Sequence, residues 1–195
     1  MFIDYVSLLL VNMVAGYFLL AAFVYLGLDD PDRRRWAPGF LMVGLVATVF
    51  GGLITLSWPL PGPYNAAFGE MSVLFGVIFL GAGLAMAIGW SLATVAGYAF
   101  FAGSAAIVIG ARIISLKLTL VPLLSGTGFI LSGFAGVMAA PTLAVMKNNR
   151  PLRAIACLIL IAAGLIWAVT VYPEYWMHLR MFEKWTPLLM RSAGH

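Results

Sequence analysis

The stretch that decides the fold is residues 71–111, MSVLFGVIFLGAGLAMAIGWSLATVAGYAFFAGSAAIVIGA, which contains no charged side chain. It consists of two apolar runs with only Gly89-Trp90-Ser91 between them. Each run reaches the ~20 residues that an α-helix needs to cross a hydrocarbon core of ~30 Å. Both are continuously apolar rather than alternating, which favours helices over the strands of a membrane barrel. The stretch therefore predicts two membrane-spanning helices joined by a very short turn.

The composition of the whole chain points to the same class of protein. Of its 195 residues, 63% are apolar and only 9% are charged, whereas a soluble domain carries about 25% charged residues. The mean hydropathy is +1.04. Because a water-soluble protein of this length cannot hide so much apolar surface, the composition excludes a soluble enzyme of a common fold, a secreted disulfide scaffold and a disordered chain.

Six apolar runs can be drawn along the chain, which predicts an all-α membrane bundle of six transmembrane helices in residues 1–172. The runs cover about residues 5–28, 38–58, 66–88, 91–112, 120–146 and 152–172. Residues 173–195 mix aromatic with charged side chains. This composition predicts an amphipathic helix lying in the membrane interface, or a kinked extension of the sixth span, followed by a tail.

Small residues recur every four positions on three of the predicted spans. Such stripes let helix backbones approach closely, so the third, fourth and fifth spans are expected to form the tight interior of the bundle. The alternative is that glycine is simply common in membrane helices. The stripe residues are Gly81, Ala85 and Gly89, then Ala102, Ala106 and Gly110, and finally Gly128, Ser132, Gly136 and Ala140.

The basic residues determine the expected orientation. The net charge is +4, and the bases stand at the ends of apolar runs, where they anchor to anionic headgroups, so nucleic acid is not an expected partner. One side of the predicted bundle carries Arg33, Arg34, Arg35, Lys147, Arg150 and Arg153, and the other carries Arg112, Lys117, Arg180, Lys184 and Arg191. Because the first set clusters in two short loops, the positive-inside rule places those loops in the cytoplasm and both termini outside it.

Several cofactors and catalytic motifs are not expected. The single cysteine, Cys157, excludes internal disulfides, Cys-ligated zinc and iron–sulfur clusters for this chain alone. A bis-histidine haem site needs two facing histidines, but His178 lies at the rim of the bundle and His195 is the last residue. Motifs for nucleotide binding, zinc proteases and serine hydrolases do not occur in the sequence.

Carboxylates and an imidazole gather on the side of the termini: Asp4, Glu70, Glu174 and His178. Glu174 and His178 are four positions apart and so share one face of a helix. Such a group suits a divalent metal or a proton-transfer relay. The alternative is interfacial anchoring and pairing, with Glu70 in the first turn of a helix and His178 in an aromatic belt.

Two further polar residues are expected to have structural roles. Asn12 lies within the first span, where an amide facing lipid is costly, so it is predicted to face inward and bond to a neighbouring helix. Arg112 ends the fourth span and is predicted to pair with Glu70 or to extend to the membrane interface.

Several short segments carry a resemblance to a known family, and the similarity extends over nearly the whole chain, although it is weaker in the first span. They are 68–70 (FGE) with 74–77 (LFGV), 98–103 (YAFFAG), 122–133 (PLLSGTGFILSG), and 175–178 (YWMH) with 185–187 (WTP). Together they resemble a family of small polytopic bacterial and archaeal membrane proteins catalogued as a domain of unknown function. The resemblance implies a membrane fold and a prokaryotic cell membrane, and it assigns no activity and no catalytic residue.

Three classes of function follow from these observations. The favoured class is a non-catalytic subunit or accessory component that packs against other membrane proteins, because the chain is small, its loops are short and it lacks a catalytic motif. The second is a metal-binding or proton-handling protein that uses the rim residues. The third is a small-molecule or ion transporter, which needs a polar path through the bundle, although Asn12 is the only strongly polar group expected at that depth.

Overall fold

The structure is a computed structural model that describes residues 4–146, 149–183 and 185–186. The predicted tail from residue 187 onward lies outside the described residues, as do Lys147, Lys184 and Arg191 of the charge count. Over the described residues the chain is all-α, as predicted. The α-helices are α1 Tyr5–Ala22, α2 Ala37–Ser57, α3 Met71–Ile88, α4 Ala93–Leu116, α5 Pro122–Val137, α6 Ala139–Val145 and α7 Arg150–Met181, with helical turns η1 Phe23–Gly27, η2 Arg33–Trp36 and η3 Asn65–Glu70.

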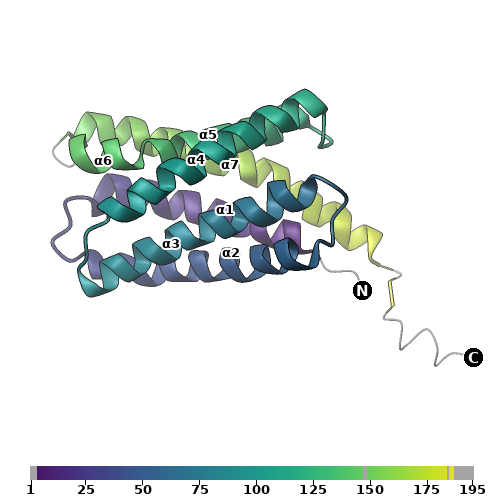
Figure 1. The fold of residues 1–195 in the computed structure, drawn as a ribbon, viewed down its shortest axis with the longest axis horizontal. Coiled ribbons are helices and arrows are strands. Elements are labelled where there is room, and N and C mark those ends of the chain that lie inside the picture. Colours follow the sequence, from purple (N-terminus) through teal and green to yellow (C-terminus); the bar gives the residue numbers. More distant parts are fainter. Residues whose placement is uncertain (1–3, 147–148, 184, 187–195) are drawn as a thin grey trace, which may run out of the picture.

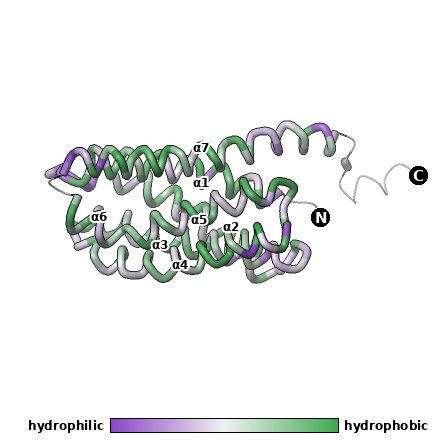
Figure 2. The backbone as a smooth tube through the Cα atoms, turned by 90° about the horizontal axis from the view of Figure 1, so that it is seen from above, coloured by the Kyte–Doolittle hydropathy of each residue, from purple (hydrophilic) through white to green (hydrophobic). Residues whose placement is uncertain are grey.

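The long helices run side by side between two ends of the bundle (Figure 1). Five helical segments in the described chain are long and apolar enough to cross a membrane, or six if α5 and α6, which meet at an angle of 45°, form one span. Hydrophilic residues gather at the two ends, and the helices between them are mostly hydrophobic (Figure 2). Helix length and hydropathy therefore define a multi-pass membrane protein whose solvent is a lipid bilayer.

Local chemistry explains where several helices begin. The Asp4 carboxylate accepts a hydrogen bond from the Ser7 backbone N–H at 3.2 Å and so caps α1. The Asn149 side chain accepts one from the Leu152 N–H at 3.2 Å and caps α7. Pro122 occupies the first turn of α5, where a missing N–H costs nothing. Caps of this kind satisfy N–H groups that have no partner inside the helix.

Glycines bring α2 and α3 into backbone contact. A Cβ atom on Gly44 would lie 2.5 Å from the backbone nitrogen of Leu80 and 2.8 Å from the carbonyl oxygen of Gly76. A Cβ atom on Gly76 would lie 2.5 Å from the backbone nitrogen of Thr48. Real Cβ contacts are never this short, so only glycine permits this distance between the two helices.

Glycines also bring α4 and α5 into backbone contact. A Cβ atom on Gly103 would lie 2.5 Å from the carbonyl oxygen of Gly133, and one on Gly110 would lie 2.6 Å from that of Gly126. Within each helix these contact glycines are seven positions apart, as Gly69, Gly76 and Gly83 are in the η3–α3 segment. Seven is the repeat of a seam between two supercoiled helices, so the tight contacts follow this period as well as the four-residue stripes.

The four-residue stripes are divided among several environments. Gly110 and Gly136 lie in the α4–α5 contact, whereas Gly128 faces Trp167 of α7, at 3.0 Å from an added Cβ. The remaining stripe residues are placed as follows: Gly81 faces Val95 of α4, Ala85 is buried, Gly89 ends α3 with a φ of +80°, Ala102, Ala106 and Ser132 line a narrow interior cavity, and Ala140 borders a cavity at one rim.

The C-terminal segment differs from a separate interfacial helix. α7 is one helix of 32 residues with Pro173 inside it, and it is long and apolar enough to cross a membrane by itself. Proline removes one backbone hydrogen bond, but membrane helices tolerate this loss when tertiary contacts hold the chain. Beyond Pro173, Tyr175 packs on the core and His178 contacts Asp4 of the α1 cap. These contacts keep residues 173–181 helical and in line with the span.

Candidate functional site

The rim at which α1 begins and α7 ends contains a small polar cluster. The Asp4 Oδ2 atom lies 2.6 Å from Nδ1 of His178, and the Ser7 hydroxyl lies 3.3 Å from the same nitrogen. Asp4 and His178 are partly exposed, while Ser7 is buried. Because one carboxylate both caps α1 and contacts α7, the cluster ties the first helix of the bundle to the last.

The geometry of this cluster does not fit a serine nucleophile. A Ser-His-Asp relay needs the serine on one ring nitrogen and the carboxylate on the other. Here Ser7 and Asp4 both reach Nδ1 of His178. The cluster is therefore a hydrogen-bonded link between two helices.

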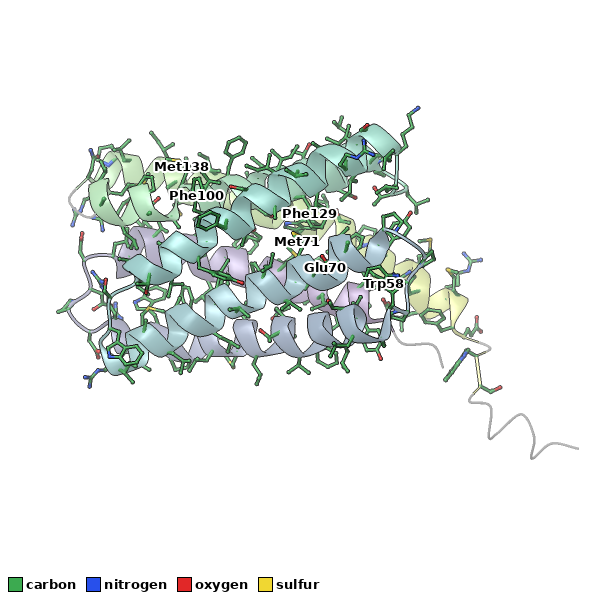
Figure 3. All side chains as sticks on the ribbon, in the orientation of Figure 1. Trp58, Glu70, Met71, Phe100, Phe129 and Met138 are labelled. Atoms are coloured by element: carbon green, nitrogen blue, oxygen red, sulfur yellow. The ribbon has the colours of Figure 1, made fainter. Side chains whose placement is uncertain are left out.

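The other predicted rim residues differ in their relation to the Asp4–His178 contact. Glu174 is half-buried one turn before His178, and the charges of His178 and Asp4 both act on its carboxyl group. Glu70 is exposed beside Met71 at the start of α3 (Figure 3). Arg112 is exposed in the last turns of α4 and forms no ion pair with a described residue. Across the residues that the structure describes, no three His, Cys, Asp or Glu side chains converge as a metal site would require.

Several interior polar groups form hydrogen bonds between helices, although the buried Thr48 hydroxyl has no partner among the described residues. The Asn12 amide donates to the Val43 carbonyl oxygen of α2 at 2.9 Å, which is the inward contact predicted for it. On the other side of the bundle, the Trp167 indole N–H donates to the Ser132 hydroxyl at 3.2 Å, and Tyr17 also bonds to Ser132. Such bonds join α1, α2, α5 and α7 at a depth where unpaired polar groups are costly.

A narrow cavity lies between α3, α4, α5 and α1. Its volume is about 60 Å³, and apolar side chains make up most of its wall. Met71 and Phe129 border it from α3 and α5 (Figure 3). This volume is well below the ~300 Å³ at which ligand pockets begin, so the cavity does not qualify as a substrate site.

The opposite rim is organised by carboxylate–arginine pairs. Arg153 is only 3% exposed, and its Nη2 lies 2.5 Å from Oδ2 of Asp29. Arg35 lies 2.5 Å from Oδ2 of Asp30, which also accepts the indole N–H of Trp36 at 3.1 Å. The turn at residues 29–32 is thus a set of specific contacts that fix the start of α2 and the start of α7.

The carboxyl of Asp30 links stability to pH. Burial alone would raise the pKa of this group, but the bonds from Trp36 and the Asp32 N–H and the charge of Arg35 outweigh it, so its pKa lies below the ordinary value. A group whose pKa is lowered by folding stabilises the protein above its ordinary pKa, and this stabilisation disappears as the pH falls through the folded pKa. We therefore expect wild-type protein to lose thermal stability below about pH 4 and the Asp30→Asn variant to lose less over that range.

Thermal melts of both proteins in one detergent, taken from pH 6 to pH 3, measure this difference. Asp32→Asn is the matched control, because that carboxylate contacts only backbone N–H at 3.2 Å and no cation in the described chain. If wild type and Asp30→Asn lose the same melting temperature between pH 6 and pH 3, the lowered pKa of Asp30 is contradicted.

The roles of several of these residues were not predicted from the sequence. Arg153 stands seven positions before Leu160, on the stripe that continues through Gly164, Trp167 and Val171, and all five are buried. That register marks Arg153 as an inward-facing base, and it could have been read from the sequence. Ser7 is three positions after Asp4, where a capping aspartate accepts the backbone N–H, so this bond is predictable from the sequence. The contact of Ser7 with His178 depends on the tertiary fold.

The fold and these contacts define the class: over the described residues this is a multi-span, all-α membrane protein with its charged side chains at the two rims of the bundle. The chain belongs to the family described as "Protein of unknown function (DUF981)", which it matches over residues 1–181. This confirms the resemblance seen in the sequence. No curated protein and no solved structure matches the chain.

Proposed function

We propose that this protein is a non-catalytic accessory component of a membrane complex and that it contacts its partner through the end of α7. The observation that carries the proposal is the single helix of 32 residues. At 1.5 Å per residue it is ~48 Å long, whereas a bilayer measures ~40–45 Å including its headgroups. We call residues 173–181 the C-terminal arm.

The surface of the arm supports a protein contact. The arm extends past the ends of α2 and α3 (Figure 1). Trp176 is 83% exposed there, and Leu179 and Met181 are also exposed, with Arg180 between them. Exposed aromatic, apolar and arginine side chains are the types enriched at protein interfaces. A helix that leaves the bilayer along its own axis presents them beyond the lipid.

The Asp4–His178 contact gives the arm a fixed direction. It lies within the arm and joins it to the cap of α1, 174 positions away in sequence. Tyr175 packs on the core from the same segment. A recognition surface held in one orientation loses less conformational entropy on binding than a mobile tail does.

The proposal includes an orientation in a prokaryotic cell membrane. We take α5 and α6 together as one bent span, which makes six spans and puts both ends of the chain on one side. Among the described residues, the rim with Arg33, Arg34, Arg35, Arg150 and Arg153 is the more basic one. The positive-inside rule then places that rim in the cytoplasm and the arm outside the cytoplasm.

Site-specific photocrosslinking in native membranes tests the arm. A photoreactive amino acid at position 176 is expected to form a discrete adduct with another protein. The matched control is position 56, because Leu56 is 89% exposed on the membrane-spanning part of α2 and is expected to label lipid. A second control adds Asp4→Asn to the position-176 protein, and the yield of the protein adduct should then fall.

Adducts with lipid alone from position 176 would overturn the partner contact and would favour an arm that lies on the membrane surface. Equal protein labelling from positions 56 and 176 would also count against it, since that pattern reflects crowding in the membrane.

A proton-handling role is the second candidate, and the 2.6 Å contact between Asp4 and His178 favours it. Protonation of an imidazole strengthens its bond to a carboxylate. This role predicts that His178→Gln lowers the yield of the position-176 adduct, even though a glutamine can still form a hydrogen bond to Asp4. An unchanged yield in His178→Gln would argue against the role.

A further inference from the structure

We propose that the cavity beside Arg33 holds the anionic headgroup of a membrane phospholipid. The cavity has a volume of about 380 Å³ and lies at the rim opposite the C-terminal arm. Leu28 closes it from the end of α1 and η1, Ser91 and Leu92 from the α3–α4 turn, and Ala140 and Leu143 from α6. Its volume falls in the range of about 300–1,000 Å³ typical of small-molecule sites.

The bend between α5 and α6 shapes this cavity. α6 departs from the direction of α5 by 45° after Val137, and none of its residues is fully buried. The α3–α4 turn ends at the same rim, where Gly89 has a φ of +80° and stops α3. The cavity therefore lies between α6 and the α3–α4 turn. The bend after Val137 sets the direction of α6, and the end of α3 at Gly89 sets the position of the turn.

Arg33 supplies a cation to this space. One guanidinium nitrogen of Arg33 donates to the Leu28 carbonyl oxygen at 2.7 Å, which fixes the side chain. A guanidinium has five N–H donors, so others remain for a ligand. The nearby acids have other partners, since Asp29 pairs with Arg153 and Asp30 with Arg35, while Asp32 accepts the backbone N–H of Arg34. Among the described residues, Arg33 forms no pair with a carboxylate.

Ser91 adds a second hydrogen-bonding group to the lining of the cavity. Its hydroxyl oxygen accepts the Ala93 N–H at 3.2 Å, and its own O–H is left to donate. The described charged residues of this rim are five arginines and three aspartates: Arg33, Arg34, Arg35, Arg150, Arg153, Asp29, Asp30 and Asp32. The excess of positive charge favours an anion at the cavity.

The combination of these groups indicates a phospholipid. A planar guanidinium matches the oxygens of a phosphate in geometry and charge, and basic pockets between membrane helices on the cytoplasmic side are typical headgroup sites. Leu28, Leu92 and Leu143 provide apolar wall on which the first carbons of an acyl chain can pack. Inorganic phosphate shares the anionic chemistry and lacks the apolar part, so the lipid is the occupant that satisfies both.

Native mass spectrometry of the purified full chain with added phosphatidylglycerol tests the proposal. Wild type is expected to retain one phosphatidylglycerol more firmly than phosphatidylcholine, and Arg33→Gln should weaken that retention about tenfold, as the loss of one charge-assisted contact predicts. The matched control is Arg34→Gln, since Arg34 is exposed and does not line the cavity. It should bind as wild type does.

A second pair of variants tests the space itself. Ala144→Phe places a ring in the cavity from α6 and should displace the lipid without changing any charge. Val145→Phe adds the same ring to an exposed neighbour that does not line the cavity, so its lipid binding should be unchanged.

Three results would overturn the site. Equal losses in Arg33→Gln and Arg34→Gln would mean that the rim attracts anionic lipid by charge alone. Full retention in Ala144→Phe would mean that the lipid binds elsewhere. Displacement of the lipid by millimolar inorganic phosphate would mean that the cavity takes a free anion. Retention that falls in Arg33→Gln and Ala144→Phe, is preserved in both controls and resists phosphate would support it.

Discussion

Gly76→Val is expected to separate α2 from α3 and to lower the melting temperature of the protein by about 6–12 °C. A Cβ atom at this position would lie 2.5 Å from the backbone nitrogen of Thr48, and a backbone atom cannot rotate away as a flexible side chain does. Overpacking of a rigid contact costs about 3 kcal/mol or more, and each kcal/mol corresponds to roughly 2–4 °C for a chain of this size.

Gly52→Val is the matched control for this experiment. Gly52 lies on α2, and an added Cβ there has no neighbour within 4 Å. The control introduces the same side chain into the same helix pair. It therefore separates the effect of the short backbone contact at Gly76 from the general effect of replacing glycine by valine. Melting followed by tryptophan fluorescence in one detergent compares the two variants, and equal melting temperatures would refute the proposed role of the glycine contact.

The second large effect is expected from Asp29→Asn. Arg153 is almost completely buried, and its Nε has no hydrogen-bond partner among the described residues. Removal of the Asp29 charge therefore leaves an inward-facing guanidinium without its counter-ion. Breaking such a pair costs about 3 kcal/mol, the low end of the usual range, because the Asp29 side chain is 44% exposed to solvent.

Arg153→Met distinguishes an unpaired charge from a lost contact. The substitution removes the buried cation and fills much of its volume, while Asp29 stays hydrated at the rim. We expect Arg153→Met to melt near the wild type and well above Asp29→Asn, since replacing a buried ion pair by apolar side chains is often neutral. A lower melting temperature for Arg153→Met than for Asp29→Asn would contradict this account.

Composition and run length predicted the class of fold because both follow from the cost of placing charges and bare backbone in lipid. The inward direction of Asn12 was predicted for the same reason. Helix partners were harder to predict, because two periods coexist among the small residues of α5 and its neighbours. Gly128, Ser132, Gly136 and Ala140 are four positions apart, whereas Gly103 and Gly110 of α4, and Gly126 and Gly133 of α5, are seven positions apart. Only the position of a facing helix decides which period becomes an interface.

The two rims differ in what the sequence reveals. Asp4 and His178 were predicted to lie on one side, and the structure brings them within 2.6 Å, but Glu70 lies apart because its helix begins elsewhere on that rim. The cavity beside Arg33 was not predicted. It depends on the 45° bend of α5 and α6, and a continuous apolar run from 120 to 146 gives little indication of that angle.

The pairing of helices has a consequence for how the protein is made. α2 with α3, and α4 with α5, are neighbours in sequence joined by short turns, so each pair can close as soon as its second helix enters the bilayer. α1 packs along α7, which is synthesised after the other described helices. The ribosome therefore has to release the chain through α7 before α1 gains this neighbour, and a chain truncated before Arg150 leaves α1 with an open flank in the lipid.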